Sequence, residues 1–315
     1  MENTRAKTTR NSLILLLTAT IWGMAFVSQS KGMDYMHPFT FNGVRSLIGA
    51  AGILIYILIS RKIAGDKAAK LDWKLNVKAG LLCGIFLTIA STLQQFGIKY
   101  TSVGKAGFIT TLYIIFVPMF GIFLKKKVAP VVWAAAGMAA VGMYLLCMTE
   151  SLRLGAGDIM VFLCAIAFAI QIMTVDHYAA SIDGAVVSCI QFTVCGVVCC
   201  IGALIWGQPT FGQIQEGLGA LLYAGVLSCG VGYTLQIVGQ KGLNPTVAAL
   251  IMSLESVIAT ISGWIAYKIG FLSTDQTLTP RQIAGCVIVF AAVILVQLPP
   301  EWFRFGKKNA SIKNA

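Results

Sequence analysis

Charged side chains are scarce in this sequence. Asp, Glu, Lys and Arg make up 11% of its 315 residues, whereas hydrophobic residues make up 57%. Soluble globular domains carry about 25% charged residues. A chain with so little charge cannot cover a folded core with a water-soluble surface, so a soluble globular domain is excluded. The mean hydropathy of +0.80 leads to the same conclusion.

Residue patterns that carry metal, redox or nucleotide chemistry are also scarce. The two histidines, His37 and His177, are far apart and form no H-E-x-x-H arrangement, and the chain has neither a Walker loop nor a G-x-G-x-x-G turn after a strand. The nine cysteines include no C-x-x-C pair and lie in apolar runs, where thiols pack as small hydrophobic groups. We therefore expect no cofactor, no metal site and no catalytic residues.

Long apolar runs are what the sequence has in abundance. Each is close to the ~20 residues that a helix needs to cross a bilayer. The runs are continuously apolar rather than alternating, which excludes a β-barrel. We predict an all-α integral membrane fold of about ten transmembrane helices. They cover residues 12–29, 39–59, 79–96, 105–124, 131–148, 158–175, 184–206, 217–238, 246–267 and 282–298.

The basic residues indicate an orientation. The net charge of +12 comes from Lys and Arg in short loops and tails, without the basic face of a nucleic-acid reader, so no nucleic-acid partner is expected. With the N-terminus inside, cytoplasmic segments hold 17 of the 24 Lys and Arg and external segments hold five. The positive-inside rule then places both termini, including a basic tail at 301–315, in the cytoplasm of a bacterial-type plasma (inner) membrane.

A cleaved signal peptide is the alternative interpretation of residues 5–29. Arg5, Lys7 and Arg10 precede the first apolar run, as in a signal peptide. The run is longer than a typical signal core and lacks an A-x-A-like cleavage site. A retained first span is favoured.

An internal repeat divides the chain. Residues 92–109 read TLQQFGIKYTSVGKAGFI and residues 234–251 read TLQIVGQKGLNPTVAALI, which align at a shift of 142 positions. We predict two repeats, 1–150 and 151–300, of about five helices each. An odd number of spans makes the second copy enter the membrane from the opposite side, so the repeats are inverted, as in many secondary transporters.

Two charged residues lie well inside predicted spans, Arg45 and Glu255. Each costs at least ~2.5–3.5 kcal/mol at mid-bilayer, so such residues face the protein interior or a wet cavity. Arg45 therefore either forms an ion pair or has a functional role, unless its side chain extends to the membrane interface. Glu255 either binds a proton, a cation or a substrate amine, or is a protonated group bonded to a neighbouring helix.

The repeat predicts which residues share a cavity with these charges. The 142-residue shift pairs Tyr113 with Glu255 and Gln94 with Gln236, and a shift near 146 pairs Trp22 with Phe168 and Arg45 with Gln191. The predicted substrate-binding or coupling residues are Trp22, Arg45, Gln94, Thr110, Tyr113, Phe168, Gln191, Gln236 and Glu255. The three glutamines serve equally well as hydrogen-bonding contacts between helices. Lys105 lies at the predicted cavity mouth, where snorkelling is the alternative, and Gly80 and Gly84 have the spacing that lets helices approach closely.

Several segments together resemble the EamA-type branch of the drug/metabolite transporter (DMT) superfamily. They are Trp22-Gly23, Arg45, SVGKAGFITTLYIIFVPMFG at 102–121, SLES at 253–256 and PRQIAG at 280–285. The resemblance implies ten helices in inverted repeats, a cavity lined by spans one to four and six to nine, and peripheral fifth and tenth spans. It also implies transport of amino acids, metabolites, nucleotide sugars or drugs. The chain departs from the family pattern at Leu124-Lys125, at Ser256 and in a long 268–280 connection.

These observations predict a secondary transporter rather than an enzyme. The solute is a small molecule such as an amino acid or a related metabolite, with export as one direction and a proton or other cation as the coupling ion. The lipid bilayer is the other partner, and pairing with a second copy as a homodimer is left open. A receptor or channel, or a membrane-embedded enzyme, is the alternative.

Overall fold

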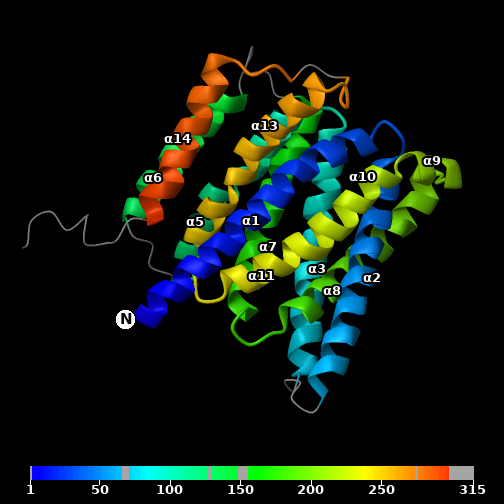
Figure 1. The fold of residues 1–315 in the computed structure, drawn as a ribbon, viewed down its shortest axis with the longest axis horizontal. Helices are drawn as coiled ribbons and strands as arrows, with labels where there is room; N and C mark the ends of the chain where they lie inside the picture. Colours follow the sequence, from blue (N-terminus) through cyan, green and yellow to red (C-terminus); the bar gives the residue numbers. More distant parts are fainter. Residues whose placement is uncertain (1, 66–70, 126–129, 148–154, 274–275, 298–315) are drawn as a thin grey trace, which may run out of the picture.

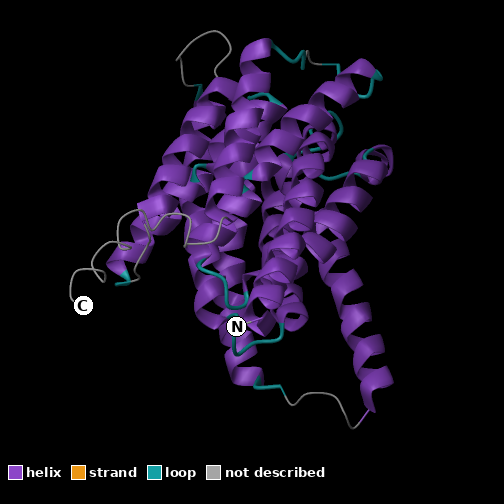
Figure 2. Ribbon diagram, turned by 60° about the vertical axis from the view of Figure 1, so that its left-hand side comes forward, coloured by secondary structure: helices purple, strands orange, loops and turns teal. Residues whose placement is uncertain are grey.

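The computed structural model describes residues 2–65, 71–125, 130–147, 155–273 and 276–297. Every regular element within these ranges is helical, and none is a strand (Figure 1, Figure 2). Within the same ranges, eight helical stretches are long and apolar enough to cross a membrane. The chain is therefore a multi-pass helical membrane protein. The predicted tail at 301–315 lies outside the described residues.

The helices of the first half mostly correspond one to one with predicted spans. Their bounds are α1 (Glu2–Gly32), α2 (Pro38–Ala64), α3 (Trp73–Ile98), α4 (Val103–Thr111), α5 (Tyr113–Phe123) and α6 (Pro130–Cys147). Polar caps begin several of them, because the first backbone N–H groups of a helix have no partner within it. The Asp72 side chain accepts from Leu75 N at 3.0 Å, and the His37 ring accepts from Phe39 N at 3.4 Å.

The second half is divided into more pieces. Its helices are α7 (Ala156–Tyr178), α8 (Gly184–Gly202), the π-helix η2 (Ala203–Gly207), α9 (Phe211–Glu216), α10 (Leu218–Leu222), the π-helix η3 (Tyr223–Gly232), α11 (Tyr233–Gln240), α12 (Pro245–Met252), α13 (Leu254–Lys268) and α14 (Pro280–Gln297). The eighth predicted span, 217–238, is therefore not one regular α-helix. Its middle is a ten-residue π segment, a geometry that is frequent at functional sites.

Two predicted spans, 105–124 and 246–267, correspond to stretches long and apolar enough to cross a membrane, Val103–Phe123 and Pro245–Lys268, but neither is one continuous α-helix. The first breaks at Leu112, between α4 and α5, and the second at Ser253, between α12 and α13. At both breaks a side-chain hydroxyl donates a hydrogen bond to a backbone carbonyl. Thr111 Oγ1 donates to Phe108 O at 2.8 Å, and Ser253 Oγ donates to Leu250 O at 2.7 Å. Such bonds compete with the regular helical pattern.

The α6 and α14 helices carry shorter apolar stretches, Pro130–Gly142 and Pro280–Leu295. These helices correspond to the predicted spans 131–148 and 282–298, whose last residues lie outside the described ranges. They pack against each other at one side of the bundle, away from its middle (Figure 1).

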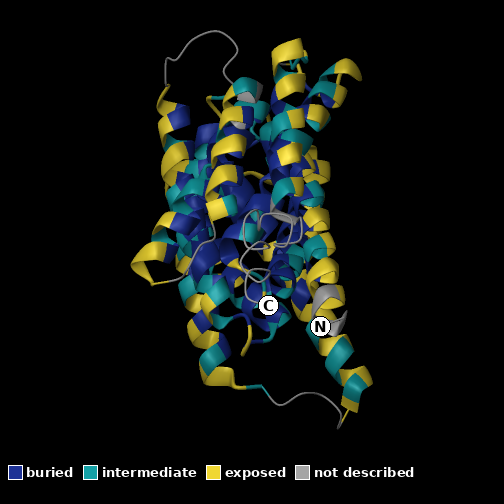
Figure 3. Ribbon diagram, turned by 90° about the vertical axis from the view of Figure 1, so that its left-hand side faces the viewer, coloured by how far each residue is buried: buried dark blue, intermediate teal, exposed yellow. Residues whose placement is uncertain are grey.

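Close helix packing forms the core. A Cβ atom at Gly80 would lie 2.7 Å from Ile190 Cβ, and one at Gly84 would lie 2.9 Å from Val194 Cβ, so α3 approaches α8 as closely as the glycine spacing predicted. Buried residues gather in the middle of the bundle, and exposed residues cover its outside (Figure 3). Large apolar side chains such as Leu58 and Ile201 are exposed there, as a lipid-facing surface requires.

The first helix is central to this packing. α1 contacts α13, α11 and η3, and its Leu15, Ala19 and Phe26 side chains are buried. This packing is the arrangement that we expect if the first span is retained.

Candidate functional site

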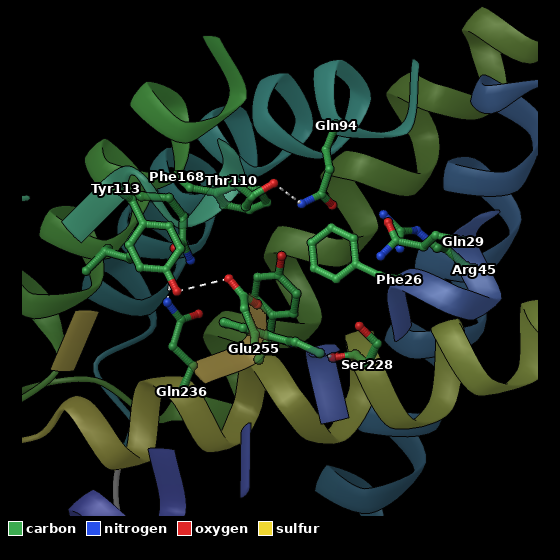
Figure 4. A pocket seen from close by; sticks show the side chains of 14 residues that line it. Phe26, Gln29, Arg45, Gln94, Thr110, Tyr113, Phe168, Ser228, Gln236 and Glu255 are labelled. Carbon is green, nitrogen blue, oxygen red and sulfur yellow. Dashed lines mark hydrogen bonds between the residues drawn. The ribbon is translucent and has the colours of Figure 1, made fainter. Parts of the chain in front are cut away.

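A cavity lies between helices of both halves in the middle of the bundle (Figure 4). Its empty volume is about 460 Å³, including the space at its opening. The lining comes from α1, α2, α3, α4, α5, α7, η3, α11 and α13. The lining residues are Trp22, Phe26, Gln29, Arg45, Gln94, Thr110, Tyr113, Phe168, Gln171, Ile172, Ser228, Tyr233, Gln236 and Glu255.

Glu255 and Tyr113 meet in this cavity. The Tyr113 hydroxyl donates a 2.9 Å hydrogen bond to Glu255 Oε1, and the Glu255 side chain is 3% exposed. Each residue follows directly on one of the two helix breaks, which brings both side chains to mid-span. A lone carboxyl group at this depth can take up a proton or bind a cation.

Arg45 enters the same cavity from α2, on the other side of Phe26 in the view of Figure 4. It is 5% exposed, and its guanidinium lies 5.5 Å from the centre of the Phe41 ring, a cation–π distance. No carboxylate among the described residues forms an ion pair with it. Its Nε is buried without a hydrogen-bond partner.

Amide side chains supply the other polar groups. Gln94 Nε2 donates to Thr110 Oγ1 at 3.1 Å, and Gln236 Nε2 donates to Gln171 Oε1 at 3.2 Å. Several amide atoms facing this region are buried without a partner: Gln29 Oε1, Gln171 Nε2 and Gln236 Oε1. Buried polar groups are normally hydrogen-bonded, so the cavity offers unused donors and acceptors.

Aromatic rings form the walls. The rings of Trp22 and Tyr233 have centroids 4.5 Å apart, and those of Phe192 and Tyr233 have centroids 5.0 Å apart. The Trp22 indole points its N–H at Ser228 O, 3.4 Å away in η3. Apolar walls with a few convergent polar groups are typical of small-molecule sites.

An ion pair joins the first turns of α4 and α7. Lys105 Nζ lies 2.6 Å from Asp158 Oδ2. Thr101 Oγ1 donates to Asp158 Oδ1 at 2.8 Å, and Gly155 N donates to Asp158 Oδ2 at 2.9 Å. Lys105 is therefore bound to a carboxylate of the protein itself rather than directed freely toward solvent.

The comparisons with known proteins point to one family. The model of the EamA-like transporter family matches residues 10–148 and, a second time, residues 155–298. The chain belongs to this family. Relatives of this EamA-like chain include an "Uncharacterized transporter" of Archaeoglobus fulgidus, 28% identical over 90% of this chain and 84% of its own length. The "Uncharacterized transporter YwfM" of Bacillus subtilis is 24% identical over 92% of this chain and 94% of its own length.

The fold of the EamA-like chain also occurs in a solved crystal structure. The two superpose with a TM-score of 0.71 over 94% of this chain and 99% of the other, at 16% sequence identity. At this identity the likeness shows a common fold, and it carries no information about the solute.

Most of the predicted site residues come together in the cavity. Eight line it: Trp22, Arg45, Gln94, Thr110, Tyr113, Phe168, Gln236 and Glu255. Gln191 does not line it. It belongs to α8 and is fully buried, with its backbone against Gly84 of α3. Neither its side-chain nitrogen nor its side-chain oxygen has a hydrogen-bond partner. Lys105 also lies outside the lining, in its ion pair with Asp158.

Sequence reasoning missed six lining residues: Phe26, Gln29, Gln171, Ile172, Ser228 and Tyr233. The amides of Gln29 and Gln171 inside apolar runs were a usable signal, because a span residue with two polar groups needs partners. The repeat did not find them, since the 146-residue shift places Gln29 opposite Val175 and Gln171 opposite Ala25. No sequence signal singles out Ser228 or Tyr233, whose positions depend on the π segment.

Proposed function

We propose that the chain is a secondary transporter that carries a small metabolite across a bacterial-type plasma membrane by alternating access. The observation that carries this proposal is the cavity itself: polar and aromatic groups of both halves face one space in the middle of a membrane bundle. A small molecule with apolar and polar parts fits such a lining.

An inverted repeat of about five helices per half is part of the proposal. Two close contacts support it: Gly97 packs directly against Val161, and Gly239 packs directly against Leu15. Gly97 and Gly239 are equivalent at the 142-residue shift, and Leu15 and Val161 at the shift of 146. The first contact lies near one end of the bundle and the second near the other, as an axis in the membrane plane demands.

The two helix breaks support the repeat as well. The hydroxyl groups that donate to backbone carbonyls there belong to Thr111 and Ser253, which are 142 positions apart. The family model also matches twice, once in each half. Two near-equivalent halves can exchange conformations, which opens one central site to each side in turn. This property favours a carrier over an enzyme.

The solute that we favour is an amino acid or a related metabolite, with export as the direction. Glu255 is the proposed coupling residue, since it is the one acidic residue in the cavity lining. Binding and release of a proton or another cation there would link solute movement to an ion gradient. We place both termini in the cytoplasm, because most Lys and Arg then face inward.

A channel is the second candidate, and the central packing counts against it. A Cβ atom at Gly23 would lie 2.7 Å from Glu255 O, and one at Gly232 would lie 2.6 Å from Trp22 Nε1. The helices thus meet tightly beside the polar groups. A continuous pore would need a wide path at this depth.

Flux into proteoliposomes tests the proposal. Purified protein is reconstituted, and uptake of radiolabelled amino acids is measured with and without an imposed pH gradient. A carrier gives a saturable rate and counterflow, in which solute inside the vesicle accelerates entry from outside. A rate that rises linearly with concentration and shows no counterflow would contradict the proposal and favour a pore.

A further inference from the structure

Arg45 is a buried cation for which the described residues supply no anion. Its side chain is 5% exposed and lines the cavity. Among the described residues, the only ion pairs within 4.0 Å are Lys31–Asp34 and Lys105–Asp158. A guanidinium keeps its charge in proteins. This one therefore stays charged and unpaired inside the bundle.

The groups around Arg45 offer weak compensation. The ring of Phe41 lies below the guanidinium at 5.5 Å. The charge of Arg45 acts on the thiols of Cys195, Cys199 and Cys229 and on the phenol of Tyr233, none of which is a carboxyl group. The acidic residue of the cavity, Glu255, is bonded to Tyr113 instead.

An unpaired charge in an apolar interior is strongly unfavourable unless a partner arrives. Gln29 lines the same cavity, and its Oε1 is also buried without a partner (Figure 4). The lining therefore holds two unsatisfied groups, one donor and one acceptor. Such groups gain their partners when a ligand binds.

We propose that Arg45 is the anion subsite of the cavity and that the solute carries a carboxylate, which forms a charge-assisted hydrogen-bonded pair with its guanidinium. This inference rests on the proposed transport function and names the chemical class of its solute. The apolar part of the solute then contacts the rings of Trp22, Phe26 and Phe168.

The charge of the lining selects a singly charged anion. Arg45 is the only cationic residue among the lining residues, and Glu255 is the only acidic one. A phosphate group carries up to two negative charges and usually meets several cationic or N–H donors. One guanidinium matches the planar geometry and the single charge of a carboxylate.

A first test needs no ligand. Arg45→Met removes an unpaired buried charge while keeping an unbranched side chain of similar length. We expect the thermal unfolding midpoint of the ligand-free variant in detergent to equal or exceed that of the wild type. If Arg45 instead holds the fold together, the midpoint falls, and a fall of several degrees would overturn the proposal.

A second test compares matched ligands. Leucine, phenylalanine and glutamine are each offered as the free acid, the carboxamide and the methyl ester, and binding is measured by thermal stabilisation and titration calorimetry. We expect at least one free acid to bind, and its two derivatives that lack the carboxylate to bind at least about tenfold more weakly. Equal binding of an acid and its carboxamide would overturn the proposal.

Variants then locate the effect. Arg45→Gln should remove the preference for the acid, and Arg45→Lys should retain part of it. The matched control is Arg281→Gln, because Arg281 also lies over an aromatic ring, 5.3 Å from the centre of Tyr144, but outside the cavity. Its ligand preference should be that of the wild type. If saturable transport persists with an uncharged solute, the carrier function stands and the anion subsite alone is wrong.

Discussion

The Tyr113 hydroxyl donates to the Glu255 carboxyl across 142 positions of sequence, at 2.9 Å. The two residues are equivalent at the shift that aligns residues 92–109 with 234–251. Tyr113 is the first residue of α5 and Glu255 the second of α13, so each follows a helix break. One hydrogen bond thus joins corresponding points of the two halves at the centre of the cavity. Any movement of one half against the other must strain or break it.

Replacing Glu255 by Gln tests its role in coupling. The amide keeps the shape of the side chain and a partner for Tyr113, but it cannot exchange a proton. We expect proton-driven accumulation in proteoliposomes to be lost while solute exchange continues. Tyr113→Phe is the companion variant, in which the carboxyl group remains and accumulation should persist at an altered rate. Unchanged uphill transport by the Gln variant would remove Glu255 from the mechanism.

The Lys105–Asp158 pair should hold one end of the cavity closed. Asp158→Asn leaves Lys105 without its counter-ion, and we expect a loss of about 1.5–3 kcal/mol of stability, the range for a hydrogen bond to a charged group. Labelling from outside of a cysteine placed at Thr110 should become faster. The control is Asp34→Asn in the exposed Lys31–Asp34 pair, where we expect less than about 1 kcal/mol. Equal labelling rates in the two variants would argue against a closure role.

Glycine at position 23 lets α1 lie against the backbone beside Glu255. In Gly23→Ala the new Cβ would lie 2.7 Å from Glu255 O and 2.6 Å from Ile258 Cβ. We expect destabilisation of about 1–3 kcal/mol from overpacking, together with reduced transport. Gly52→Ala is the control, because no atom lies within 4 Å of its added Cβ. That change in an exposed helix position should stabilise by up to about 1 kcal/mol. A silent Gly23 variant would show that α1 can move aside.

Cysteine labelling in intact cells tests the orientation. Lys74 at the start of α3 and Glu216 at the end of α9 are exposed, and we place them on opposite sides of the membrane. A membrane-impermeant maleimide should modify Glu216→Cys from outside and leave Lys74→Cys unmodified until the cells are opened. The chain without an added cysteine provides the background. Modification of Lys74→Cys in intact cells would reverse the assignment of the two termini.

His37 should make stability depend on pH. Burial and the nearby Lys99 charge lower the pKa of His37 from its ordinary value of 6.5. The unfolded chain therefore takes up a proton more readily than the folded one, so stability is complete above pH 6.5 and declines as the pH falls below that value. His37→Asn replaces the ring nitrogen that accepts from Phe39 N with a side-chain oxygen, another good helix cap, and should show a shallower decline. The test measures thermal unfolding midpoints of the wild type and of the variant between pH 7.5 and 5, a range chosen around the usual histidine pKa of about 6.5. Parallel pH profiles of the two proteins would contradict the prediction.

Much of the helical layout follows from local composition. Runs such as those of α1, α2 and α3 are apolar for the length of a membrane crossing, and a helix in lipid satisfies its own backbone. The glycines at 80 and 84 act locally too, because a missing side chain permits close approach whatever lies opposite. The 142-residue shift also predicted that Tyr113 and Glu255 face one cavity, and both line it.

Gln191 shows where that reasoning stops. Its repeat partner, Arg45, lines the cavity, but Gln191 lies fully buried beside Gly84. The repeat predicts equal positions only if both halves pack in the same way, whereas α8 packs with Gln191 against Gly84 of α3. Such a contact depends on the neighbouring helix, so no periodicity in the sequence indicates it.

The sequence by itself determined that this is a helical membrane protein, which residues form most of its spans, and that Arg45 and Glu255 lie in its interior. These features follow from the hydrophobicity of each segment and from the free-energy cost of placing a charge in lipid. Both are properties of a segment taken by itself. The tertiary structure decided where the helices break, that Lys105 binds Asp158, and that no carboxylate among the described residues pairs with Arg45. Those outcomes depend on contacts between residues tens of positions apart, because a side chain's partner is set by how the helices pack.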